Sequence, residues 1–63
     1  MEKIIKLAQH NVKIWIENVE DNYEISNSTE EYIVNLIVEW YVEGEVCEVI
    51  GDEEYRGWWS IEK

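Results

Sequence analysis

The segment from Glu17 to Tyr55 holds 13 of the 15 acidic residues of the chain and not a single Lys or Arg; Glu2 and Glu62 are the other two acids. The same segment is rich in Val, Ile, Trp and Tyr, which a solvated acidic tail lacks. A chain that buries these apolar side chains must fold with its carboxylates outside. The formal net charge is −10, and self-repulsion of this kind weakens the compact state.

The length of 63 residues leaves room for a single acidic domain, 1–63, with one small core and no deep catalytic cleft. The lone cysteine, Cys47, excludes an intramolecular disulfide framework, so we expect a reducing cytoplasm, that of the host if the protein is viral. No apolar run reaches the ~20 residues of a membrane span or resembles a signal peptide. The negative charge also disfavours anionic lipid and phosphate. We therefore expect neither membrane association nor direct nucleic-acid binding.

The clearest secondary-structure signal predicts a helix over about 29–43. Ser28 stands three residues before Glu31, which is the spacing of a capping box. Polar residues then recur four apart and form a narrow stripe on an otherwise apolar helix: Glu31, Asn35, Glu39 and Glu43. Gly44 follows, where a helix C-terminus favours glycine. The same residues also alternate as in a strand, so the alternative is an all-β meander with 31–42 as a strand.

The rest of the chain shows strand patterns. Segments 45–50 and 55–61 flank the turn residues 51–54 and predict a β-hairpin. The apolar positions of the N-terminal third also fit a helix, but we predict strands there, with turns at 9–11 and 20–22. These strands are placed at about 3–8, 12–18 and 23–26. The predicted fold class is α+β: a small single domain in which an antiparallel β-sheet of hairpins packs against one helix.

No motif in the chain indicates a reaction. There is no glycine-rich phosphate loop, no Gly-x-Ser-x-Gly sequence and no pair of His residues to hold zinc. Cys47 lies among apolar residues of a predicted strand, where we expect a buried thiol, and His10 falls in a predicted turn. The acidic turn 51–54 lacks the ligand spacing of a calcium loop. We expect no enzymatic activity, no cofactor and no metal site.

The four tryptophans divide between core and surface. Adjacent residues of a strand point to opposite faces, so only one of Trp58 and Trp59 can face the core. The other is then exposed and is a candidate anchor for a protein interface. We expect Trp40 to be part of the core.

A short stretch of the chain resembles the central part of SH3 domains. Residues 43–50 lead from a Gly-acid turn into an apolar strand, and Gly57-Trp58-Trp59 follow. The similarity covers less than a third of the chain. SH3 domains carry a further hairpin and a Pro-containing aromatic segment after the tryptophan pair, which this sequence lacks. We interpret the similarity as shared β-hairpin composition and recognise no family over the full length.

Charge and composition lead to a functional hypothesis. The chain resembles in composition the small acidic inhibitors that phages deploy against restriction, CRISPR or DNA-repair enzymes. A folded acidic surface can meet the Lys and Arg side chains that normally hold nucleic acid. The expected partner is thus a basic, nucleic-acid-binding protein. The residues expected to contact it are Glu20, Asp21, Glu31, Glu39, Glu43, Asp52, Glu53, Glu54, Trp58 and Trp59.

The alternative is a non-catalytic structural or assembly module. Such a module would self-associate, as a homodimer for example, through the exposed tryptophan and an edge of the sheet. In that case the acids would be rim and solvent residues.

Overall fold

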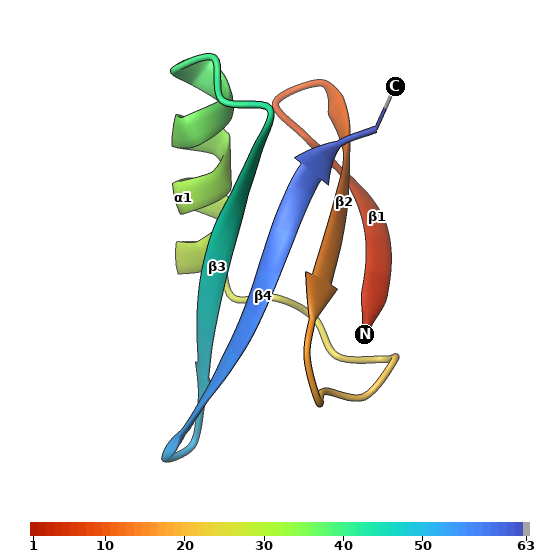
Figure 1. The fold of residues 1–63 in the computed structure, drawn as a ribbon, viewed down its shortest axis with the longest axis vertical. Helices are drawn as coiled ribbons and strands as arrows, with labels where there is room; N and C mark the ends of the chain where they lie inside the picture. Colours follow the sequence, from red (N-terminus) through yellow and green to blue (C-terminus); the bar gives the residue numbers. More distant parts are fainter. Residues whose placement is uncertain (63) are drawn as a thin grey trace.

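A four-stranded antiparallel sheet and one helix make up the protein, for which a computed structural model describes residues 1–62 (Figure 1). The strand order is β1-β2-β4-β3, so β1 and β3 are the two edges. The elements are β1 (Glu2–Leu7), β2 (His10–Ile16), α1 (Asn27–Val38), β3 (Glu43–Ile50) and β4 (Glu53–Ile61). This arrangement confirms the predicted α+β class, with an antiparallel sheet of hairpins packed against one helix, and excludes the all-β meander.

The N-terminal hairpin joins β1 to β2 through a two-residue turn. Leu7 pairs with His10, and the turn residues Ala8 and Gln9 have φ values of 49° and 67°. Positive φ at both positions is the signature of a type I′ turn, whose twist matches that of the flanking strands. The turn was predicted at 9–11 and lies slightly earlier, but the two strands are as expected.

The predicted third strand at 23–26 is wrong, because this segment forms no strand. Tyr23 and Ile25 instead pack against the core from a connecting loop. The loop ends at Ser26, the N-cap of α1, whose side-chain oxygen accepts a hydrogen bond from the Thr29 N–H at 3.2 Å. The helix therefore begins earlier than 29, and Ser26 rather than Ser28 is its cap.

The helix ends at Val38, before the predicted end at 43. Glu39 is the C-cap, and the chain then turns through Trp40, which has a φ of 75°. The Trp40 N–H donates to the Ile37 carbonyl and the Tyr41 N–H to the Leu36 carbonyl, both at 3.0 Å. These two bonds define a Schellman motif in which tryptophan occupies the position that glycine usually takes.

Gly44 does not cap the helix but lies in β3, opposite Trp59. A Cβ atom at Gly44 would approach the Trp59 Nε1 to 2.6 Å. Glycine is required here because the indole ring packs directly against the backbone of the edge strand.

The core lies between α1 and one face of the sheet. The helix contributes Ile33 and Ile37 at a spacing of four, and β2 contributes every second residue, as expected for elements with one buried face. The buried apolar residues are Met1, Val12, Ile14, Ile16, Ile33, Ile37, Val46 and Trp59. The other face of the sheet is not covered by the helix and carries the alternate residues of each strand.

Candidate partner-binding surface

Two acidic segments that are distant in the sequence lie at the same end of the sheet. The loop between β2 and α1 and the turn between β3 and β4 both project from the lower end in Figure 1. The antiparallel order places them there, because β2 ends beside the start of β4, and the Glu17 N–H donates to the Arg56 carbonyl at 2.8 Å. We call this region the acidic end; its exposed carboxylates belong to Glu17, Glu20, Asp21, Glu24, Asp52, Glu53 and Glu54.

An open hollow of about 420 Å³ separates the two segments of the acidic end. Its lining combines apolar and polar side chains from both: Asn18, Val19, Glu20, Asn22, Tyr23, Ile50 and Tyr55. The Tyr55 hydroxyl donates to a Glu53 carboxylate oxygen at 2.9 Å. This hydrogen bond, followed by the negative charge of Glu53 and slight burial, raises the pKa of Tyr55. The acidic end thus contains a hollow of mixed apolar and polar lining, to which Glu20 contributes a carboxylate.

A buried carboxylate holds the loop in place. Glu48 is only 2% exposed, and its Oε2 accepts the Tyr23 hydroxyl at 2.9 Å. Its Oε1 accepts the Ser26 N–H at 3.0 Å and the Ser26 hydroxyl at 3.2 Å. The pKa of Tyr23 is raised to about 12, first by burial and then by the hydrogen bond to Glu48 and the negative charge of Glu48. Glu48 therefore fixes both the acidic loop and the N-cap of the helix to β3.

The sequence analysis did not single out Glu48, although a signal for it exists. Glu48 stands two residues after Val46 on β3, and Val46 is a buried apolar residue on the core-facing side of the strand. A carboxylate at a core-facing position of a strand requires several donors, because burying an unpaired charge is costly. A glutamate at such a position therefore predicts a network of buried hydrogen bonds.

Few of the carboxylates that the structure describes have a cationic partner. Within residues 1–62, one ion pair is formed, between Lys13 Nζ and Glu2 Oε1 at 3.4 Å. The described Lys and Arg side chains all lie on strands, and the ammonium group of Met1 donates to the Ile16 carbonyl: the four side chains are Lys3, Lys6, Lys13 and Arg56. In this part of the chain no ion pair involves the acidic end.

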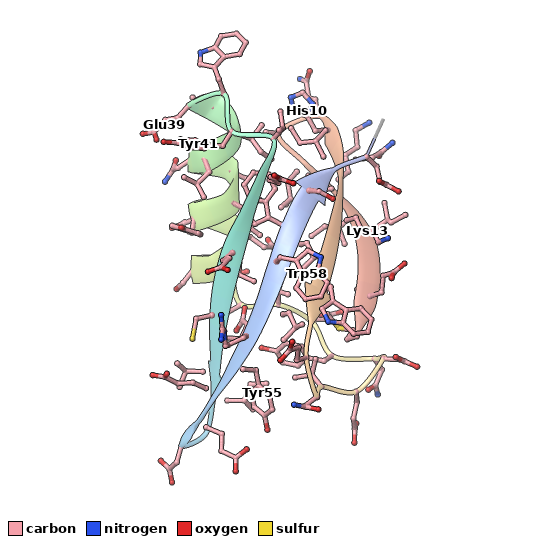
Figure 2. All side chains as sticks on the ribbon, in the orientation of Figure 1. His10, Lys13, Glu39, Tyr41, Tyr55 and Trp58 are labelled. Carbon is pink, nitrogen blue, oxygen red and sulfur yellow. The ribbon has the colours of Figure 1, made fainter. Side chains whose placement is uncertain are left out.

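The predicted helix stripe does not join the acidic end. Glu31 and Glu39 are exposed, but Glu43 begins β3 and is not on the helix. Figure 2 shows Glu39 near one end of the molecule and Tyr55 near the other. The structure therefore brings together Glu20, Asp21 and the acids of 52–54, and separates them from Glu31, Glu39 and Glu43.

The tryptophan pair divides as predicted. Trp59 is fully buried, whereas Trp58 is 48% exposed on the uncovered face of the sheet. Trp58 pairs with Trp15 across β4 and β2, with ring centroids 5.7 Å apart and an interplanar angle of 31° (Figure 2 shows Trp58 over these strands). Trp40, which was expected in the core, is 92% exposed. That expectation is wrong because the helix stops short of Trp40.

The residues considered for catalysis do not meet. His10 is exposed at the start of β2, and Cys47 is exposed in the middle of β3, so the expectation of a buried thiol is wrong. Cys47 faces outward because Val46 and Glu48 occupy the core-facing positions on either side of it. The strand β4 separates β2 from β3. Among residues 1–62, no group of His, Cys, Asp and Glu side chains has a metal-binding arrangement.

Comparison of the chain with protein-family models, with curated proteins and with solved structures found no match. In the described part of the chain, no helix has the length and apolar character needed to cross a membrane.

Proposed function

We propose that this protein is a non-catalytic inhibitor whose acidic end docks onto the basic, nucleic-acid-binding surface of a partner protein. The observation that carries the proposal is the placement of Glu20 and Asp21 at the same end of the sheet as Asp52, Glu53 and Glu54 (Figure 1), with a hollow between the two segments that Glu20 helps to line. No described cation pairs with these carboxylates.

The chemistry of nucleic-acid-binding surfaces matches this arrangement. Duplex DNA carries one charge per ~1.7 Å of helix axis, and proteins that bind it present Lys and Arg at a similar density. Carboxylates form charge-assisted hydrogen bonds with those side chains and accelerate association by electrostatic steering. The apolar side chains that line part of the hollow can contact the methylene stems of the same Lys and Arg side chains.

The acidic end is also held in place before binding. The Tyr23 N–H donates to the Glu20 carbonyl at 3.0 Å, and the Tyr23 side chain is bound to Glu48. The opposing segment is a tight turn between paired strands. Little conformational entropy is lost when such a surface binds, in contrast to a disordered acidic tail. We place the protein in the cytoplasm, because a reducing compartment keeps the thiol of Cys47 free and because nucleic-acid-binding partners are found there.

A charge-reversal experiment tests the location of the binding surface. The triple variant Asp52→Lys, Glu53→Lys, Glu54→Lys is compared with the wild type in binding to a synthetic arginine-rich peptide. We expect the variant to bind about tenfold more weakly at low salt and to show a shallower dependence on NaCl, because three steering charges are reversed. In the wild type, the amide resonances of 17–23 and 50–55 are expected to shift most.

The matched control is the triple variant Glu31→Lys, Glu39→Lys, Glu62→Lys, which changes the net charge by the same amount away from the acidic end. We expect it to weaken binding much less than reversal of 52–54 does. Equal losses in the two variants would show that the peptide senses only net charge, and the acidic end would not be the binding surface.

Self-association, the alternative function, is compatible with this proposal. The acidic end lies on a loop and a turn, whereas the sheet edges lie along β1 and β3.

A further inference from the structure

The edge of the sheet formed by β1 has free backbone groups. Met1 and Ile16 exchange two backbone hydrogen bonds, at 2.7 and 2.9 Å. In an antiparallel ladder such pairs alternate, so Met1, Lys3, Ile5 and Leu7 direct their N–H and C=O groups toward β2. The groups of the intervening residues, Glu2, Ile4 and Lys6, point to the open edge. Within residues 1–62, no other segment forms backbone hydrogen bonds with them.

The side chains of these edge residues are complementary to themselves. Glu2, Ile4 and Lys6 alternate along β1 and therefore share the uncovered face of the sheet. We propose that two copies of the chain pair through β1 in antiparallel orientation, with Ile4 on the two-fold axis. In this register Glu2 of each copy, which also pairs with Lys13 of its own chain, lies opposite Lys6 of the other copy, and Ile4 lies opposite Ile4.

The backbone supports this register. The three facing pairs, Glu2 with Lys6, Ile4 with Ile4 and Lys6 with Glu2, are all hydrogen-bonded pairs, because each member points its N–H and C=O outward. The result is a continuous sheet in the order β3-β4-β2-β1-β1-β2-β4-β3, with both helices on the same face. Shifting the strand by two residues in either direction removes at least one facing ion pair.

Charge selects β1 over the other edge. The edge strand β3 carries Glu43, Glu45 and Glu48 and no cation, so two β3 strands would bring like charges together. The strand β1 carries two lysines and one acid in a chain whose net charge is −10. Antiparallel pairing through β1 also directs the two acidic ends to opposite ends of the joined sheet, which keeps their repulsion small.

The proposed dimer would bury the exposed apolar side chain of Ile4. Ile4 is 57% exposed in the single chain, and it would be covered by its counterpart across the axis. Lysines on an edge strand commonly prevent pairing, but here each Lys6 meets a carboxylate rather than another cation. One pair of short strands makes a small interface, so the dimer is of the weak, concentration-dependent class.

Charge-swap variants test the register by sedimentation over a roughly hundredfold range of concentration. Each single variant, Glu2→Lys or Lys6→Glu, turns both Glu2–Lys6 pairs of the dimer into pairs of like charges. We expect roughly tenfold weaker dimerisation for each. The double variant Glu2→Lys, Lys6→Glu restores opposite charges and is expected to dimerise within about threefold of the wild type. Glu2→Lys also reduces the net negative charge, so general repulsion alone predicts the opposite result for this variant. Glu45→Lys on β3 is the control and should not weaken association.

Cysteine cross-linking tests the position of the axis. In a Cys47→Ser background, Ile4→Cys places two thiols on facing residues whose Cα atoms are about 5.5 Å apart, within disulfide reach. Lys6→Cys places them about 14 Å apart, beyond that reach. We expect oxidation to give a covalent dimer of the first variant only. A chain that sediments as a monomer at all concentrations, dimerisation that Glu2→Lys leaves unchanged, or equal cross-linking at both positions would overturn the proposal.

Discussion

Trp40 has the least favourable backbone conformation among the described residues for the size of its side chain. Its φ of 75° lies in the left-handed region, where L-residues other than glycine and asparagine are disfavoured by about 1–2 kcal/mol. The side chain is 92% exposed, so burial does not offset this strain.

Replacing Trp40 with glycine is expected to stabilise the protein. Trp40→Gly removes the left-handed strain of the Schellman motif and loses almost no buried surface, so the free energy of unfolding should rise by about 1 kcal/mol. Thermal denaturation followed by circular dichroism should show a melting temperature about 4–8 °C higher. A lower melting temperature would mean that the indole ring makes stabilising contacts.

Tyr23 gives the protein a predictable response to alkaline pH. The pKa of Tyr23 is raised from 10.0 to about 12 by burial and by the bond to Glu48. The folded state therefore holds this proton more tightly than the unfolded state, and the resulting stability is complete below pH 10. It is lost as pH rises from about 10 to about 12.

The variant Tyr23→Phe isolates this effect. At pH 8 it should be less stable by about 1–2 kcal/mol, because a Glu48 oxygen loses its hydroxyl donor. The stability difference between wild type and variant should shrink between pH 10 and 12, measured by urea denaturation. Parallel stability curves across that interval would show that Tyr23 and Glu48 are not coupled.

At the scale of elements, periodicity predicted both hairpins and the helix, and tertiary contacts set their limits. Ser26 rather than Ser28 caps the helix because Glu48, which is distant in the sequence, binds the Ser26 backbone and hydroxyl. Alternation predicted that one of Trp58 and Trp59 is buried. The structure shows that Trp59 is the buried one, packed against Gly44. Sequence patterns of local origin do not contain such contacts.

The turn between β1 and β2 is a second site for stabilisation. Ala8 and Gln9 both have positive φ, whereas Asn-Gly is the preferred pair for a type I′ turn. The double variant Ala8→Asn, Gln9→Gly should raise the free energy of unfolding by about 1 kcal/mol, which thermal denaturation would detect. An unchanged or lower melting temperature would indicate that this turn is not strained.

At the scale of the whole molecule, the sequence predicted exposed acids but not their grouping. Composition predicted that the carboxylates lie outside, and this prediction is wrong for Glu48, which is buried and bound by Tyr23 and Ser26. That Asp21 and Asp52 lie at one end depends on the strand order β1-β2-β4-β3, which local patterns do not encode. Glu43 was assigned to the same helical stripe as Glu31, and the early end of the helix separates them.

The scarcity of ion pairs predicts that salt stabilises the protein. With one ion pair among residues 1–62 and a net charge of −10, repulsion exceeds attraction at low ionic strength. The melting temperature should therefore rise as NaCl is added from near zero. A steady fall would mean that attractive pairs dominate.

Competition with DNA tests the proposed inhibitor function most directly. The immobilised protein is used to capture a partner from a lysate at low salt, and the partner is then offered short duplex DNA or an uncharged polymer at matched ionic strength. We predict that the DNA releases the partner and that the protein, in turn, displaces DNA from it, because both occupy the same basic surface. A stable complex of all three would contradict this prediction.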